Sequence, residues 1–514
     1  MALVTLVRPP TIVAKWAHTT PTCPPIGLAY LAGSLQQAGH RVNVLDAVGE
    51  NVSQMLPVED NRFLSHGLSA DEIADRIDPE SLVVGVSCMF SHEWPQTRTV
   101  INRLREQLPH AAIVAGGEHI TALPAFSLED CAALDYCVVG EGEETMTELV
   151  GALAAGQPAH SVAGVVSRLD GAIHQTANRA RIKQVDEIPS PAWETIPLSN
   201  YLDNGFGFGV NRGRSMPILA TRGCPYQCTF CSNPSMWTTR WIARDPHLLL
   251  EEMKEYIRRY QVTNFDFYDL TAIVKKEWTV DFCRLIKQSG LEFTWQLPSG
   301  TRSEAIDAEV SQLLYEAGCR NMTYAPESGS PAVLKRIKKK VDLHRMKISM
   351  RGAIKNGLNV KANIILGFPD ETHREVWETL KFCVEMAALG VHDMSISPFS
   401  PYPGSELFDQ MKEGGKISSF SNDYFYSLAT YTDLLNTVSV ADRISGRALG
   451  LYRLFGMILF YAVSYAVRPW RLVRMLINVF GERQESRLEM SLRDLFFRVK
   501  RPRAKPLSSS PVSG

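Results

Sequence analysis

The chain carries the stretch TRGCPYQCTFCSNP at residues 221–234. It places Cys224, Cys228 and Cys231 in the spacing C-x3-C-x2-C, and no fourth cysteine follows nearby. Three thiolates on one short loop indicate a metal centre. Iron–sulfur clusters are held by cysteine thiolates, most often by four of them. Three ligands therefore leave one iron of a four-iron cluster open to another molecule.

The same cysteines are compatible with a second interpretation, a structural zinc site completed by a histidine. His247 is the only histidine within reach in the sequence, and it follows Asp245 and Pro246. That pattern predicts the first turn of a helix, where a side chain usually lies at the surface. The cluster interpretation is favoured because Tyr226 and Phe230 lie between the cysteines and would shield a cluster from water.

Length and composition indicate a multidomain globular protein. The 514 residues exceed one ordinary core and predict two or three domains. The net charge of -1 creates no field that favours nucleic acid, so we expect no nucleic-acid partner. Ten cysteines in a chain of this length are not a secreted disulfide framework, and the start MALVTLVRPPTIV lacks the basic region of a signal peptide. We therefore expect a cytoplasmic protein.

Residues 1–155 alternate between strand-like and helix-like segments. The expected strands are 3–7, 41–46, 81–89, 111–115 and 136–139. The expected helices are 26–38, 68–77, 96–108 and 144–155. This alternation predicts an α/β domain with a doubly wound parallel sheet, which binds ligands at the carboxyl ends of its strands.

Two further regions follow. Residues 156–212 are rich in turns and short strands, with Pro189, Pro191 and Pro197, and this composition predicts a linker. Residues 213–400 alternate again, with strands expected at 217–221, 264–268, 293–297, 322–325, 360–366 and 394–397. Strand count alone permits either a barrel or a second doubly wound sheet.

The C-terminal region, residues 401–498, is predicted to be helical, and residues 454–467 are an uncharged run. This run is shorter than the roughly 18–20 residues that span a bilayer. It is either a buried helix or a helix lying at a membrane surface, with arginines reaching outward from its ends. The flanking arginines are Arg447, Arg453, Arg468, Arg471 and Arg474. Residues 499–514 are basic and then rich in Pro and Ser, which predicts a disordered tail.

The cysteine spacing is similar to that of the radical S-adenosylmethionine (SAM) superfamily, and residues 1–430 resemble its cobalamin-dependent branch. The resemblance implies a [4Fe-4S] cluster on Cys224, Cys228 and Cys231, with SAM chelating the open iron. It implies a cobalamin-binding Rossmann-like domain at residues 1–155 and a partial (β/α)6 barrel at residues 213–400. It also implies an electron donor such as flavodoxin or ferredoxin, because one electron splits SAM into methionine and a 5′-deoxyadenosyl radical.

Three segments in chain order resemble the SAM-binding motifs of this superfamily: YAPESGS at 324–330, NIILGFPDET at 363–372 and SPFSPYPGSEL at 397–407. The resemblance implies that Glu327, Ser328 and Gly367 seat SAM, the first two through hydrogen bonds and the glycine through close backbone approach. Asp269 occupies an acidic position of the family. Three arginines are either carboxylate contacts or surface ion-pair partners: Arg240, Arg244 and Arg302.

Glycines close two strands of the first region. Gly116 and Gly117 precede His119, and residues 140–143 read GEGE. Such glycines let a flat macrocycle approach the backbone, and the resemblance implies that Gly116, Gly117 and His119 line a cobalamin pocket. Many cobalamin domains carry Asp-x-His-x-x-Gly after the first strand, whereas this chain reads RPPTIVAKW there. We therefore expect cobalt without a histidine ligand from that motif.

The resemblance implies a methyltransferase that uses two SAM molecules. One methylates the cobalt, and the other gives the radical that takes hydrogen from an unactivated carbon of a small molecule, which is a natural product, a tetrapyrrole or a lipid. Two alternatives remain. One is a radical SAM cyclase or other ring-forming enzyme of the same branch, and the other is a non-catalytic cobalamin or redox sensor, against which the three SAM-like segments argue.

Overall fold

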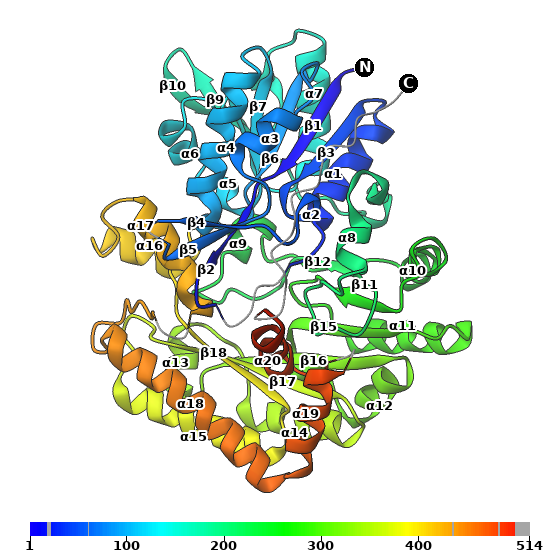
Figure 1. Ribbon diagram of the computed structural model, residues 1–514, viewed down its shortest axis with the longest axis vertical. Coiled ribbons are helices and arrows are strands. Elements are labelled where there is room, and N and C mark those ends of the chain that lie inside the picture. Colours follow the sequence, from blue (N-terminus) through cyan, green and yellow to red (C-terminus); the bar gives the residue numbers. More distant parts are fainter. Residues whose placement is uncertain (18–21, 60, 434–435, 482–483, 499–514) are drawn as a thin grey trace.

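The computed structural model describes residues 1–17, 22–59, 61–433, 436–481 and 484–498 (Figure 1). Two α/β bodies lie one above the other in this view, the N-terminal body in blue and cyan and the second in green and yellow. Of the helices that follow the second body, α16 (Glu406–Glu413) and α17 (Asn422–Ser427) lie at the left between the two bodies (Figure 1). α18 (Gly446–Val467) lies at the lower left, and α19 (Trp470–Phe480) and α20 (Arg487–Arg498) lie near the centre. The predicted tail at residues 499–514 lies outside the described residues.

A seven-stranded sheet forms the centre of the first body. In spatial order its strands are β10 (Ala172–Gln175), β9 (Val165–Leu169), β8 (Tyr136–Val138), β7 (Ala112–Gly116), β6 (Val83–Ser87), β1 (Leu3–Arg8) and β3 (Arg41–Asp46). The strands from β8 to β3 are parallel, and they are the five strands that the sequence predicts. β9 and β10 add an antiparallel edge from within residues 156–212, where the sequence predicts a linker with short strands.

Helices cover both faces of this sheet, so the doubly wound fold is confirmed. α1 (Ile26–Gln37) and α7 (Gly142–Ala154) pack on one face, where Val4 and Leu6 of β1 meet Leu35 and Leu149. α3 (Ala70–Arg76) and α4 (Trp94–Gln107) pack on the other face. The chain order reverses between β1 and β6, and such a switch point is where sheets of this kind bind ligands.

A small antiparallel sheet, which the sequence does not predict, joins the first body to the C-terminal region. Its strands are β2 (Thr11–Ala14), β5 (Phe63–His66) and β4 (Met55–Val58), and α2 (Ala47–Glu50) lies between β3 and β4 in the chain. Ile12 and Phe63 of this sheet pack with Tyr426 and Ala429. Residues more than 400 positions apart in the chain, Ile12 and Ala429, therefore share one apolar cluster.

The second body is a partial barrel of six parallel strands, as predicted. In spatial order they are β11 (Ser215–Ile218), β14 (Asn264–Phe267), β15 (Thr294–Thr301), β16 (Cys319–Glu327), β17 (Asn359–Leu366) and β18 (Asp393–Pro398). The helices around it are α10 (Pro246–Tyr260), α11 (Lys276–Ser289), α12 (Ala308–Glu316), α13 (Pro331–Arg336), α14 (Leu343–Lys355) and α15 (His373–Leu389). Polar side chains cap four of them at their N-termini: Asp245, Asp307, Asp342 and Thr372.

The first barrel strand ends earlier than predicted. β11 stops at Ile218, and residues 221–222 form a separate strand, β12 (Thr221–Arg222), which pairs with β13 (Ile242–Ala243). Asp269 causes this break, because its carboxylate accepts hydrogen bonds from the Ala220 amide at 3.2 Å and the Thr221 hydroxyl at 2.5 Å. The backbone thus turns out of the sheet immediately before the cysteines.

The C-terminal region is helical, as predicted, and contains α16 to α20. α18 lies beside α15 (Figure 1), and a Cβ at its Gly456 would come within 2.7 Å of Leu380 and Ile396. Among the described residues it is the one helix long and apolar enough to cross a membrane, and only 22% of its apolar window is buried.

Three of the arginines around this helix do not reach outward, which corrects that part of the membrane-surface interpretation. Arg453 is 1% exposed and donates to the carbonyls of Ile396, Tyr431 and Asp433 at 2.9–3.1 Å. Arg468 and Arg471 donate to carbonyls at the C-terminal end of α15. Carbonyls that end a helix or strand lack internal partners, and these guanidinium groups supply them.

We expect Arg453→Met to destabilise the protein by about 3 kcal/mol, because it leaves three buried carbonyls without donors. Urea unfolding followed by circular dichroism measures this change. Arg447→Met on the exposed side of α18 is the matched control and should change the free energy of unfolding by less than about 0.5 kcal/mol. Equal stability of the two variants would contradict the packing described for Arg453.

Candidate functional site

The cysteine loop, residues 223–232, leaves β12 through a glycine that the geometry requires. Gly223 has φ +83°, and a Cβ there would lie 2.2 Å from the Arg240 carbonyl oxygen. The middle of the loop is fixed by Thr229, whose amide donates to Ile337 O at 3.1 Å and whose carbonyl accepts from the Leu407 amide at 2.8 Å. The middle of the loop is therefore held by the barrel and by the start of α16.

The three thiols fit a cluster better than a single ion. Burial raises the pKa of all three thiols, that of Cys231 to about 12; the charge of Cys224 also raises the pKa of Cys228, and the charges of both raise that of Cys231. Among the described residues no three His, Cys, Asp or Glu side chains converge on a point where one metal ion would sit. His247 is exposed on α10. Thiolates are the ligands of iron–sulfur clusters, and the exposed His247 does not complete a zinc site, so the donor set fits the cluster.

Aromatic and cationic side chains surround the loop. The Arg302 guanidinium carbon lies 3.7 Å from the centroid of the Tyr226 ring. The Lys339 ammonium lies 5.9 Å from the centroid of Phe230 and donates to Glu327 at 2.8 Å. These two cations lower the pKa of the Cys224 and Cys228 thiols against the larger effect of burial, so they favour the thiolates that iron requires.

All three SAM-like segments come together at this loop. The first contains Glu327, which ends β16, has φ +65° and binds Lys339 beside Phe230. The second follows with Phe368, whose ring centroid is 5.9 Å from that of Phe230. The third supplies the carbonyl of Gly404, which accepts from the Ser235 hydroxyl on α9 (Asn233–Trp237) at 2.6 Å. Segments that are far apart in the chain thus line one loop, as a shared ligand would require.

Ser328 and Gly367 have internal partners in this arrangement. The Ser328 hydroxyl is buried, lies 2.9 Å from the Thr379 hydroxyl and accepts from the Ser330 amide at 3.1 Å. Gly367 has φ +86°, and a Cβ there would lie 2.6 Å from Leu449 of α18. Ser328 thus fixes the turn after β16, and Gly367 allows a tight turn against a C-terminal helix.

Glu371 in the second segment has an oxygen to spare. Its Oε2 accepts from the Gly367 amide at 2.5 Å and the Phe368 amide at 3.3 Å, whereas Oε1 is buried without a hydrogen-bond partner. Burial raises the pKa of this carboxyl to about 7. A buried acceptor of this kind suits a ligand that brings a donor, such as an amino or hydroxyl group.

The strand ends of the first body leave open space for a flat ligand. A Cβ at Gly140, which has φ +78°, would meet nothing within 4 Å, and one at Gly116 would meet only Val138, at 3.8 Å or more. The loop after β6 exposes Met89 and Phe90, at 45% and 51%, although both are large apolar side chains. A macrocycle over these strand ends would cover them, and only their position after a strand marks this pair in the sequence.

His119 does not present an open ring face. It lies on α5 (Glu118–Ala122) with 1% of its surface exposed, its Nδ1 is 3.0 Å from the Ser91 hydroxyl and its Nε2 is 3.5 Å from that of Ser127. The ring stacks on Trp94, with centroids 5.0 Å apart, and burial lowers its pKa to about 3. In this structure His119 is a neutral core histidine under the glycine pair.

Three glutamates at the same strand ends bind the cysteine loop or Arg222, the residue directly before it. Glu141 and Glu143, of the GEGE stretch, form ion pairs with Arg222, which directly precedes the loop. Glu118, next to Gly117, accepts a hydrogen bond from Ser232, which ends the loop. Sequence reasoning missed these residues, since a glutamate after a strand-end glycine reads as an ordinary surface charge. The other two predicted arginines behave differently: Arg244 pairs with Asp186 and Glu252, and the carbonyl of Arg240 accepts from Arg181.

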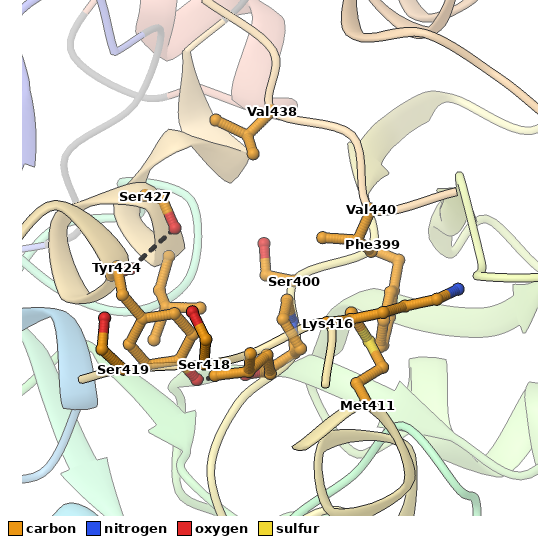
Figure 2. Close-up of a pocket in the computed structure, with 13 residues that line it drawn as sticks. Phe399, Ser400, Met411, Lys416, Ser418, Ser419, Tyr424, Ser427, Val438 and Val440 are labelled. Atoms are coloured by element: carbon orange, nitrogen blue, oxygen red, sulfur yellow. Dashed lines mark hydrogen bonds between the residues drawn. The ribbon is translucent and has the colours of Figure 1, made fainter. Parts of the chain in front are cut away.

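Figure 2 shows a cavity elsewhere, between the third SAM-like segment and the α16–α17 region. Its volume is about 200 Å³, and it is lined by residues such as Phe399, Lys416, Ser418 and Tyr424, without any cysteine of the loop. Ligand pockets usually measure about 300–1,000 Å³. We therefore do not assign the cofactors to this cavity.

Comparison with known families agrees with the two bodies. The B12 binding domain family matches residues 15–150, and the Radical SAM superfamily matches residues 218–383. An uncharacterised methyltransferase, PH0819 of Pyrococcus horikoshii, is 30% identical over 409 residues, which are 79% of this chain and 82% of that protein. An anaerobic magnesium-protoporphyrin IX monomethyl ester cyclase of Rubrivivax gelatinosus is 25% identical over 441 residues, 84% of this chain and 74% of the cyclase.

A solved structure shares the fold. It is that of the cobalamin-dependent S-adenosylmethionine radical enzyme OxsB with aqua-cobalamin and S-adenosylmethionine bound, at 14% identity and a TM-score of 0.64. The match covers 97% of this chain and 75% of OxsB. The predicted cofactor set of [4Fe-4S] cluster, SAM and cobalamin is thereby confirmed by the domains that the chain contains.

We expect each of Cys224→Ala, Cys228→Ala and Cys231→Ala to abolish cluster assembly, because each removes one of only three thiolates that the loop supplies. Anaerobic reconstitution followed by iron analysis should give roughly four irons per wild-type chain and fewer than about one per variant. Cys383→Ala, which removes a buried thiol on α15, is the control and should retain the wild-type iron content. A full iron content in any loop variant would remove that cysteine from the ligand set.

Proposed function

The chain belongs to the cobalamin-dependent radical SAM methyltransferase family, and from this premise we propose that it methylates an unactivated carbon of a small molecule. The observation that carries the proposal is the meeting of two strand-end regions. The residues that follow β7 and β8 bind both ends of the cysteine loop, which also contacts the SAM-like segments. Both cofactor regions therefore border one site, as a shared substrate requires.

When bound, the cluster with SAM supplies a carbon-centred radical, and cobalamin supplies the methyl group. The chain's own residues would hold and orient these groups. Cys224, Cys228 and Cys231 bind iron, Glu327 and Glu371 offer carboxylates to SAM, and Phe230 with Phe368 keeps water from the cluster. We include Ser328, Gly367, Gly116, Gly117 and His119 in the proposed site as residues that shape the backbone around the cofactors.

A ring-forming reaction is the second candidate, and the similarity to the magnesium-protoporphyrin cyclase favours it. Both reactions begin with hydrogen abstraction by the same radical, so the described side chains serve either. The similarity to the Pyrococcus methyltransferase reaches higher identity and covers more of the relative's length, which supports methyl transfer as the main function. We further propose a small flavodoxin- or ferredoxin-type protein as the source of the electron.

We also propose that a cytoplasmic protein of this kind touches a membrane surface through α18 and α19. Residues 443–481 contain no aspartate or glutamate and six arginines, of which Arg443, Arg447 and Arg474 are exposed. Large apolar side chains are exposed along both helices: Leu451, Leu454, Phe455, Ile458, Trp470, Val473, Leu476 and Ile477. An apolar stripe with cationic flanks suits the interface of an anionic bilayer. A second copy of the chain would instead bring arginines against arginines without acids to pair them.

For the reaction, we expect anaerobic protein with SAM labelled in its methyl group to transfer the label to carbon of the product and to release 5′-deoxyadenosine. Mass spectrometry of both products measures this. The Cys224→Ala variant is the control without a cluster and should give neither product. A cyclised product without label would select the ring-forming alternative, and the absence of 5′-deoxyadenosine from the reconstituted wild type would contradict both.

For the membrane contact, we expect the protein to sediment with vesicles of phosphatidylglycerol, and Val473→Glu with Ile477→Glu to weaken this binding at least about tenfold. These side chains are 60% and 66% exposed, so the substitutions leave the fold intact. Ile348→Glu on α14, which is 54% exposed, is the matched control and should bind as the wild type does. Equal sedimentation with and without vesicles would contradict the proposal. A wild-type dimer that is lost in the double variant would contradict it as well.

A further inference from the structure

Acidic residues of the first body hold the cysteine loop at both ends. We call this set the interdomain clamp: Glu118, Glu141, Glu143, Arg222 and Ser232. Arg222 lies two residues before Cys224, and Ser232 directly follows Cys231. The clamp therefore encloses the three ligating residues in sequence, and its carboxylates come from the two loops that border the open space above β7 and β8.

The upstream end of the clamp is a buried ion-pair network. Arg222 Nη2 lies 2.6 Å from Glu143 Oε1, and Arg222 Nη1 lies 3.2 Å from Glu141 Oε1. Glu141 Oε2 accepts from Arg181 Nε and from the Ile182 amide, both at 2.8 Å. The guanidinium of Arg222 also lies over Tyr30, 5.2 Å from its centroid. Two carboxylates thus face two guanidinium groups in a packed setting.

The ion pairs of this network fix the orientation of Arg222 as well as attracting it. Burial alone would raise the pKa of Glu143, but Arg222 overrides that effect and lowers it, so the carboxyl is ionised. Hydrogen bonds between charged partners are short and demand a particular geometry. β12 and Gly223 then transmit that geometry to the cysteines, because Arg222 pairs with Ile242 and a Cβ at Gly223 would clash with Arg240.

The downstream end has one contact of the same kind. The Ser232 hydroxyl donates to Glu118 Oε1, and burial raises the pKa of that carboxyl. Glu118 follows Gly117, whose φ of +112° brings the backbone against Cys88, where a Cβ would lie 2.4 Å from the carbonyl oxygen. The position of Glu118 is therefore set by the strand ends that would border cobalamin.

We propose that Glu118, Glu141 and Glu143 are positioning residues that fix the cluster loop relative to the cobalamin-binding strand ends. These glutamates would not bind the cluster or the cobalamin themselves. They act through Arg222 and Ser232. Only the catalytic consequence of this proposal, its effect on methyl transfer, rests on the proposed function. Loss of the clamp should let the radical form while the methyl donor is misplaced, because a displacement of about 1 Å can cost up to about a hundredfold in rate.

The first test uses cofactor-free protein and hydrogen exchange followed by mass spectrometry. Peptides covering residues 221–232 should exchange at least about tenfold faster in Glu143→Gln than in the wild type, since local opening is no longer opposed by the ion pair. Glu143→Asp keeps the charge and should give an intermediate rate. Glu144→Gln changes the neighbouring exposed glutamate and should leave the rate unchanged.

The second test uses reconstituted enzyme and measures methylated product per 5′-deoxyadenosine. This ratio should fall about tenfold in Glu143→Gln and in Glu118→Gln, while the iron content stays at the wild-type level. Glu118→Gln tests the other end of the clamp if Glu143→Gln does not fold. Wild-type exchange rates in both variants would overturn the proposal even if no methylated product is ever found. An unchanged product ratio would overturn its catalytic part.

Discussion

A buried arginine between two bodies is the contact on which the site depends. Arg222 belongs to the barrel, and its carboxylate partners Glu141 and Glu143 belong to the other body. Taking three charges out of water is costly, and the cost is recovered only while the partners stay together. Separating the bodies would leave one arginine and two carboxylates without their partners, and any of them that stayed partly buried would be an unpaired charge. The molecule therefore behaves as one unit with its chemistry at the join.

The join explains why side chains from distant parts of the chain meet the cysteines. Parallel strands place all their carboxyl ends at one edge, and the two sheets turn these edges toward each other (Figure 1). Lys339 and Arg302 bring positive charge to the thiols from the barrel side, and Glu118 brings negative charge to Ser232 from the other side. Each body alone supplies only a part of the surroundings of the cysteine loop.

The sequence predicted the elements well and the contacts poorly. Eleven parallel strands follow from apolar runs between helical patterns, because a strand covered on both faces must be apolar throughout. The short strands β2, β4 and β5 have four residues each and form a separate antiparallel sheet, so they escape that pattern. The three cysteines were evident because their spacing is local. The ion pair of Arg222 with Glu143 was not evident, because the two residues are 79 positions apart and a single sequence does not show which distant residues pair.

Some residues had roles that their type concealed. Arg453 reads as a flanking charge of an apolar helix, yet it lies inside and serves three carbonyls. Ser328 and His119 read as ligand contacts, and the fold gives both of them internal partners. In each case the side chain alone allowed either reading, and only the packing around it decides.

Gly367 has a consequence for any attempt to isolate the barrel. Its left-handed turn rests against Leu449, which lies beyond the sixth strand on a helix outside the barrel repeat. A fragment cut after β18 would lack that support and expose the turn beside Phe368. A fragment designed to keep this turn in place must therefore include the whole of α18, which ends at Val467.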